Sequence, residues 1–126
     1  MIYGIGTDIL LIHRIEQMHQ KYGDALPRRL LSRVEQHEFS GCHDPVRFLA
    51  KRFAAKEAFA KAVGMGIRAP VSFHNISVAH DSLGRPEFMC EPELQQWLIM
   101  HNISRVHLSL SDEKTQILAF AIAEKI

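Results

Sequence analysis

Residues 45–63 read P-V-R-F-L-A-K-R-F-A-A-K-E-A-F-A-K-A-V, and Gly64 follows them. Alanine, the strongest helix former, recurs along this stretch. Proline is well tolerated in the first turn of a helix, and glycine often ends one. The stretch therefore predicts a helix that begins at Pro45 and ends at Gly64. Its small side chains allow it to pack closely against a neighbouring element.

A strand is expected over residues 2–12, because this run is short, apolar and rich in β-branched residues. With the two-residue period of a strand, Gly4, Gly6 and Asp8 share one face. The glycines leave that face bare, so that a ligand or another backbone can approach it. A carboxylate in an apolar strand is costly to bury unless it is paired or binds a metal. Asp8 is therefore a candidate metal ligand; the alternative is that it ends the strand and caps a following helix.

The other elements follow from the same patterns. Short helices are expected up to Gly23, from Pro27 to Gly41 with Leu30, Leu31 and Val34 on its apolar side, and from Pro92 to Met100. Strands are expected at 76–79, 87–90, 106–110 and 117–122. Helices gathered in the first half and strands mainly in the second favour the α+β class, with an antiparallel-rich sheet packed against helices. The length of 126 residues suits one domain spanning 1–126.

Composition narrows the class of protein. Cys42 and Cys90 form no metal-binding or redox pair, which is typical of a reducing compartment. The first residues lack the pattern of a signal peptide, and no apolar run approaches the roughly 20 residues that span a bilayer. We expect a cytoplasmic protein without a membrane partner.

The charges are distributed unevenly along the chain. Residues 1–68 hold 11 Lys and Arg against 7 Asp and Glu, whereas residues 69–126 hold 4 against 7. Such asymmetry suggests a face for an anionic partner, although a chance imbalance is equally compatible with it.

Glu57 stands out because it is the only acidic residue among six basic ones in residues 45–68. Glu57 and Lys61 lie one helical turn apart. They are either a surface pair, worth about 0.2–0.5 kcal/mol, or a metal ligand beside a phosphate-binding lysine. Magnesium suits the second reading, because one or two carboxylates and substrate phosphates often hold it. The loop from Gly64 to Arg68 can present backbone N–H groups to a phosphate, although the end of a helix disfavours anions.

Five motifs occur in an order that resembles the bacterial holo-acyl-carrier-protein synthases, the short form of the 4′-phosphopantetheinyl transferase family. They are Gly4-Ile5-Gly6-Thr7-Asp8-Ile9; Arg52-Phe53-Ala54-Ala55-Lys56-Glu57-Ala58 with Lys61 and Ala62; Gly64-x-Gly66-Ile67; Gly84-Arg85-Pro86; and His107-Leu108-Ser109-Leu110-Ser111. Two positions depart from the family pattern. Met65 stands where Thr or Ser is common, and Asp112 stands where a second histidine is frequent, so no catalytic role is assigned to Asp112.

The resemblance implies the α+β fold of this family, assembled as a homotrimer with active sites between subunits. It implies transfer of 4′-phosphopantetheine from coenzyme A to a serine hydroxyl of apo-acyl carrier protein, with release of 3′,5′-ADP, in support of fatty acid biosynthesis. Asp8 and Glu57 would hold Mg²⁺, Lys61 would contact a phosphate, and Glu57 is the candidate to accept the serine proton.

The same resemblance implies two sets of binding residues. The coenzyme A site would be lined by Arg52, Lys61, Gly64, Gly66, Pro86 and His107, the last from a neighbouring subunit. Arg14 and Met18 on the first helix would contact the carrier protein. That helix is expected to lie outside the metal–diphosphate site.

Two other functions remain open from the sequence. One is a non-catalytic module of the same fold that binds coenzyme A or a nucleotide; the presence of both Asp8 and Glu57 argues against it, because binding alone can use basic residues. The other is a nucleic-acid-binding domain using the helix at 47–61. The moderate pI of 7.9 and the lack of an aromatic-basic stacking motif argue against that function, so no nucleic acid is expected.

Overall fold

A computed structural model describes all 126 residues. The helices are α1 (Ile12–Tyr22), α2 (Ala25–Leu30), α3 (Arg33–Ser40), α4 (Pro45–Ala62) and α5 (Pro92–Met100). The strands are β1 (Ile2–Leu11), β2 (Ile76–His80), β3 (Pro86–Cys90), β4 (Ile103–Asp112) and β5 (Gln116–Lys125). This arrangement confirms the predicted α+β class.

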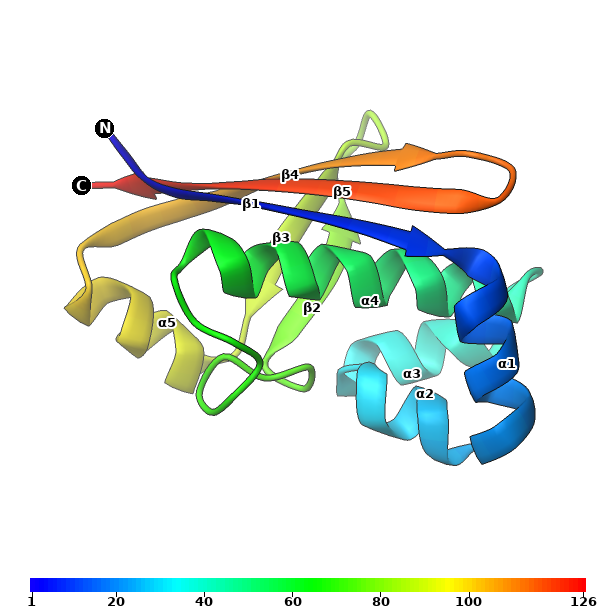
Figure 1. Cartoon of the computed structure of the whole chain (residues 1–126). Coiled ribbons are helices and arrows are strands. Elements are labelled where there is room, and N and C mark those ends of the chain that lie inside the picture. Colours follow the sequence, from blue (N-terminus) through cyan, green and yellow to red (C-terminus); the bar gives the residue numbers. More distant parts are fainter.

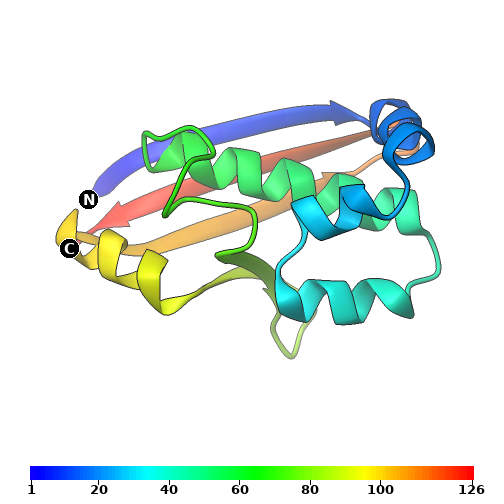
Figure 2. The ribbon, with the colours of Figure 1, turned by 90° about the horizontal axis from the view of Figure 1, so that it is seen from below.

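The strands form two antiparallel sheets. The larger has the order β1-β5-β4, so the first strand pairs with the last, and β2 pairs with β3 in a separate hairpin. Both termini consequently lie at the same end of the larger sheet (Figure 1). Helix α4 lies along one face of this sheet, with α1, α2 and α3 gathered near one end of the helix and α5 near the other (Figure 2).

Helix α4 touches strand β1 backbone to backbone. A Cβ atom at Gly4 would lie 2.1 Å from the carbonyl oxygen of Ala62, and one at Gly6 would lie 2.2 Å from that of Ala58. Only glycine permits this approach, because any other side chain would overlap the helix. The glycine face of β1 therefore accommodates the backbone of α4. This close contact fixes the separation between α4 and the strand that carries Asp8.

The two faces of the larger sheet differ in their cover. The side chains of Ala119 and Ala121, which face α4, are fully buried. On the opposite face Ile5, Ile9 and Leu118 are 59%, 68% and 39% exposed. Because strand residues alternate between faces, one side of the sheet forms the core and the other presents apolar side chains to solvent.

The predicted single helix from Pro27 to Gly41 is wrong. The structure has two helices, α2 and α3, broken at Leu31 and Ser32. Ser32 caps α3 through a reciprocal capping box, in which its side chain accepts from the backbone N–H of Glu35 while the Glu35 side chain accepts from that of Ser32. The Ser-x-x-Glu pattern starts a new helix here. The break also turns Val34 outward, where it is 63% exposed instead of apolar core.

The remaining elements match their predicted positions. Helix α4 begins at Pro45 after the N-cap Asp44 and is followed by Gly64, whose φ of 81° ends it. Helix α5 and the strands β2, β3, β4 and β5 cover the predicted stretches. None of the helices is both long and apolar enough to cross a membrane.

Candidate active site

Asp8, Glu57 and Lys61 meet where β1 passes over α4. The Nζ atom of Lys61 lies 3.4 Å from Oδ1 of Asp8 and donates to the carbonyl oxygen of Thr7 at 2.8 Å. Glu57 lies one turn before Lys61, on the same face of the helix. Asp8 is not a helix cap, because α1 starts after Leu11 without any side-chain cap. The structure thus brings the three sequence-predicted residues together.

Both carboxylates are held in a setting that disfavours their charge. Burial raises the pKa of Asp8, and Lys61 only partly offsets the rise. Burial also raises the pKa of Glu57, and the negative charge of Asp8 raises that pKa further. Two nearby carboxylates that repel each other in this way form a site that a cation would stabilise.

The two carboxylates of Asp8 and Glu57 suit magnesium better than a metal ion that takes all its ligands from the protein. No group of three or more His, Cys, Asp and Glu side chains is placed to hold a metal ion. Mg²⁺ commonly takes one or two carboxylates and completes its coordination with waters and substrate phosphates. Asp8 and Glu57 can provide those two ligands, and Lys61 adds a positive charge beside them.

Helix α1 brings Arg14 closer to this site than the sequence indicates. The positive charge of Arg14 opposes the rise in the pKa of both Asp8 and Glu57. Arg14 and Met18 also line one cavity, of about 580 Å³, together with Glu57. The expectation that the first helix lies outside the metal–diphosphate site is therefore wrong for Arg14, because the turn after β1 carries this helix past α4.

The glycine loop follows the same helix. Gly64 and Gly66 are exposed, and a Cβ atom at either position would have no neighbour within 4 Å. Met65, which replaces the common hydroxyl residue, is half-buried and packs against the core. Its sulfur lies 3.8 Å from a guanidinium nitrogen of Arg68. The loop backbone is thus open beside Lys61, but Met65 offers no hydroxyl to a ligand.

The structure does not bring Arg52 to Lys61. Arg52 is 5% exposed, and its Nε lies 3.4 Å from a carboxylate oxygen of Glu35. Its guanidinium also lies 4.2 Å from the ring centre of Phe48. Five helical positions separate Arg52 from Glu57, which places them on different faces of α4. Its assignment to coenzyme A stays a prediction that requires the guanidinium to leave these contacts.

Pro86 and His107 lie together but apart from Asp8. Both line a groove of about 510 Å³ between the β2–β3 hairpin and β4. Asp8 pairs with Ala119 across the sheet, whereas His107 pairs with Ile122 and belongs to the opposite face. There His107 contacts the carboxylate of Glu124. Within one protomer, His107 therefore points away from the face that carries Asp8.

Asp112 has a structural role. Its carboxylate contacts Arg47 and lies 2.7 Å from Nζ of Lys51, so that it joins the end of β4 to the first turns of α4. These two bases lower the pKa of Asp112 despite its partial burial. Asp112 thus connects two elements of the fold, and no catalytic role is assigned to it.

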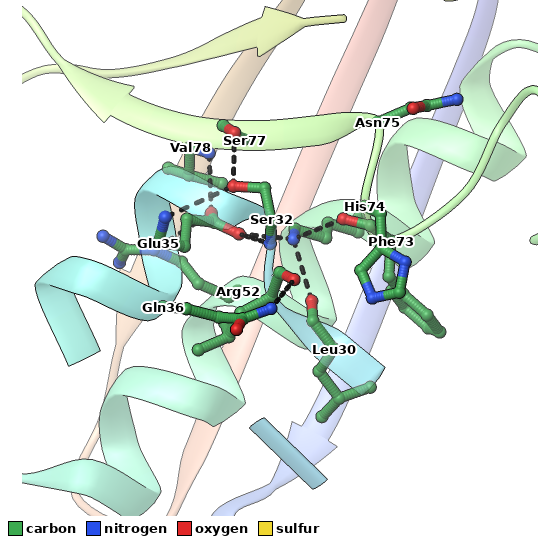
Figure 3. A network of polar contacts seen from close by, with 12 residues as sticks. Leu30, Ser32, Glu35, Gln36, Arg52, Phe73, His74, Asn75, Ser77 and Val78 are labelled. Carbon is green, nitrogen blue, oxygen red and sulfur yellow. Dashed lines mark hydrogen bonds and ion pairs between the residues drawn. The ribbon is translucent and has the colours of Figure 1, made fainter. Parts of the chain in front are cut away.

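Sequence reasoning missed a buried ionic network next to the site. Lys56 and Glu35 are both 0% exposed and form an ion pair. Figure 3 shows how Glu35 also reaches the backbone of Ser32 and Val78, which ties α3 to β2. Burial lowers the pKa of Lys56 to about 8. The available signal was the Ser32-x-x-Glu35 capping box.

Comparison with known proteins gives a consistent result. The family model described as the 4′-phosphopantetheinyl transferase superfamily matches residues 4–121. A holo-(acyl-carrier-protein) synthase of Neisseria meningitidis serogroup A is 58% identical over 99% of this chain and 100% of its own length.

Solved structures agree with these matches in sequence. The crystal structure of a holo-(acyl-carrier-protein) synthase from Neisseria meningitidis has a TM-score of 0.97 and 57% identity, over 99% of this chain and 100% of that one. The structure of such a synthase from Bacillus anthracis, in complex with coenzyme A (3′,5′-ADP), has a TM-score of 0.82 and 37% identity. It covers 100% of this chain and 99% of that one.

Proposed function

The chain belongs to the 4′-phosphopantetheinyl transferase superfamily, and on that premise we propose that Asp8, Glu57 and Lys61 form its catalytic centre. The reaction is the transfer of 4′-phosphopantetheine from coenzyme A to a serine hydroxyl of apo-acyl carrier protein, in support of fatty acid biosynthesis. The bond between the β-phosphate and the serine oxygen forms as the bond to 3′,5′-ADP breaks. One observation carries the proposal: two mutually repelling carboxylates lie beside a lysine on the close contact between β1 and α4.

The residues have distinct roles in this proposal. Lys61, with its ammonium near Asp8, contacts a phosphate oxygen of coenzyme A. Glu57 accepts the proton of the attacking serine, because its side chain lines the cavity beside α1 in which we place the carrier protein. Asp8 and Glu57 would hold Mg²⁺, and the bound ion would supply charge neutralisation at the diphosphate.

The carrier protein docks on α1 and the cavity beneath it. Arg14, Met18 and Arg29 line this cavity with Glu57, so that a serine held there lies near the proposed base. Arg14 and Arg29 are exposed and positive, which favours an acidic partner. The excess of basic residues in the first half of the chain supports the same partner.

Coenzyme A binds across a subunit boundary in a homotrimer. Gly64 and Gly66 lie beside Lys61 on one protomer, and a second copy supplies His107, which faces away from its own Asp8. The exposed apolar side chains of Ile5 and Ile9 on the same face support an interface there, because large exposed apolar patches mark association sites. Pro86, near His107, completes this lining.

We assign the whole chain, residues 1–126, to one transferase domain in the cytoplasm. The free thiols of Cys42 and Cys90 support that location, because disulfides are rare where thiols are kept reduced.

The deciding experiment is mass spectrometry of an apo-acyl carrier protein after incubation with this protein, coenzyme A and Mg²⁺. A mass gain of one phosphopantetheine is expected, and omission of Mg²⁺ with a chelator should abolish it. Binding of coenzyme A without any mass gain would instead favour the non-catalytic module, which the close relationship to named synthases does not favour.

A further inference from the structure

Lys56 holds three separate segments together from inside the protein. Its ammonium donates to the carbonyl oxygen of Leu30 at 2.8 Å, to that of Phe73 at 2.8 Å and to the carboxylate of Glu35. A lysine ammonium has three donors, so all of them are used. The partners are the last residue of α2, the segment between α4 and β2, and helix α3 (Figure 3).

Two of these partners form walls of the cavity beside Glu57. Leu30 and Phe73 line it, as do Arg14 and Met18 of α1. Lys56 precedes Glu57 in α4, so one helical turn carries both the proposed base and the anchor of the walls around it. The distance from Glu57 to either wall therefore depends on the hydrogen bonds of Lys56.

A contribution to folding stability does not by itself account for the buried ion pair between Lys56 and Glu35. Removing charges from water is costly, and buried ion pairs are often no more stabilising than apolar side chains of similar volume. An apolar pair could join α3 to α4, but it would offer no hydrogen bond to the Leu30 and Phe73 carbonyl oxygens. What the ammonium adds is a fixed position for these two segments.

We propose that Lys56 is a positioning residue for the acceptor side of the reaction: it sets the width of the cavity between Glu57, Leu30 and Phe73, and thereby the placement of the carrier protein's serine. The inference rests on the proposed function, in which that cavity receives the carrier protein. It assigns no contact between Lys56 and either substrate, because the side chain is fully buried.

The test compares Lys56→Met, which keeps the length of the side chain without its donors, with Ser77→Ala. Ser77 donates to the hydroxyl of Ser32 at 2.6 Å within the same network, and neither residue lines the cavity. Lys56→Met should raise the KM for apo-carrier protein by about tenfold, while the KM for coenzyme A stays within about twofold. Ser77→Ala should leave both KM values unchanged. Assays below the melting temperature of every variant separate this effect from unfolding.

A second variant covers the case in which Lys56→Met leaves the Glu35 charge buried and unpaired and does not fold. The double change Lys56→Met/Glu35→Gln removes both charges and should show the same rise in the KM for carrier protein. Failure of both variants to fold would assign Lys56 to stability and overturn the proposal. An unchanged KM for carrier protein together with an unchanged kcat would also overturn it.

A double-mutant cycle with Phe73→Ala gives a readout that a general loss of stability does not move. If Lys56 acts through the Phe73 wall, the two changes should raise the KM for carrier protein less than additively. Additive effects would contradict this route. A wild-type protein that cannot modify the carrier protein would refute the proposed function. An active wild type, with the same kinetic constants in the Lys56→Met variant, would refute only the role of Lys56.

Discussion

At the scale of single residues, we expect transfer to depend on two carboxylates that repel each other, and the removal of either should lower its rate strongly. Asp8→Ala and Glu57→Ala are each expected to lower kcat on the order of 100-fold, because each removes a group that stabilises charge in the transition state. Both variants should stay folded, since neither side chain has a buried partner that would be left without a charge. Turnover of carrier protein at saturating coenzyme A and Mg²⁺ measures the effect. Near-wild-type turnover in both variants would show that the metal assignment is wrong.

The raised pKa of Asp8 also predicts how stability depends on pH in the absence of metal. A folded pKa above the unfolded one means that the folded state binds more protons. This contribution to the free energy of unfolding is full below the ordinary pKa of 3.8 and is lost as the pH rises through the raised folded value. Asp8→Asn should therefore raise the melting temperature at pH 7, with little difference near pH 3.

Magnesium provides the control for that experiment. A cation that binds only the folded wild type stabilises it by mass action. Added Mg²⁺ should therefore raise the melting temperature of wild type but not of Asp8→Asn, and so narrow the gap between them. If Asp8→Asn melted at a lower temperature than wild type in metal-free buffer at pH 7, burial would not disfavour the charge of Asp8 as proposed.

The sequence predicts Asp8 and Glu57 because each is chemically unusual in its own surroundings: one lies in an apolar strand and the other in a basic helix. Lys56 and Glu35 escape the same reasoning. A lysine in a basic helix reads as a solvated side chain, and 21 positions separate it from its partner. Only the packing of α3 against α4 and β2 buries both. The Ser32-x-x-Glu35 capping box marks the start of α3, but it does not indicate this packing.

At the scale of elements, the contact between β1 and α4 links the fold to the chemistry. Gly6→Ala would place a Cβ atom 2.2 Å from the Ala58 oxygen and 2.6 Å from the Ala62 nitrogen. Because both atoms belong to a helix backbone, the helix itself must shift, and we expect a loss of about 1–3 kcal/mol in the free energy of unfolding. Transfer activity should fall as well, since Glu57 and Lys61 move relative to Asp8. Urea unfolding and carrier-protein turnover measure the two effects.

Gly41→Ala is the matched control for that substitution. A Cβ atom there has no neighbour within 4 Å, and the φ of −110° suits any residue. Its effect should stay within about 0.5 kcal/mol. Equal effects of the two substitutions would contradict the close approach of α4 as the reason for Gly6.

We expect helix α1 to affect the binding of both substrates, because Arg14 lines the docking cavity and its charge acts on Asp8 and Glu57. Arg14→Glu should raise the KM for the acidic carrier protein several-fold, because it reverses a charge at the docking cavity. It should also raise the KM for coenzyme A, since the charge of Arg14 reaches Asp8 and Glu57, where the diphosphate would lie. Arg33→Glu is the control: Arg33 is exposed and lines a different cavity, so the KM for coenzyme A should not change. An unaltered KM for coenzyme A in Arg14→Glu would place α1 outside the diphosphate site.

Local patterns predict most elements, and they fail where two signals compete. Proline and alanine at 45–63 place α4 correctly because they act within a single helix. Between Pro27 and Gly41 the apolar residues favour one helix, but the Ser32-x-x-Glu35 cap overrides them and begins α3. The bare face at Gly4 and Gly6 left a ligand or a backbone equally possible, and only the position of α4 distinguishes them.

At the scale of the whole molecule, one protomer cannot bring His107 to the face that carries Asp8. The register of the sheet puts them on opposite sides, and the side with His107 also exposes Ile5 and Ile9. The proposed homotrimer would cover each open face and would bring each His107 to the Asp8 site of a neighbour. Sequence periodicity predicts the strands, but it does not indicate whether another copy of the chain covers either of their faces.

This assembly predicts that two defective proteins restore each other. Sedimentation should give a mass near three chains for wild type. Glu57→Ala and His107→Ala should each be weak as pure trimers, since every site lacks one group. When the two are co-expressed, about one site in four combines a His107→Ala subunit that keeps Glu57 with a Glu57→Ala neighbour that keeps His107. Activity should rise well above that of either parent. Co-expression of Glu57→Ala with Glu57→Ala/His107→Ala is the control and should restore nothing. A fully active monomer, or no recovery in a verified mixed trimer, would place His107 outside the shared site.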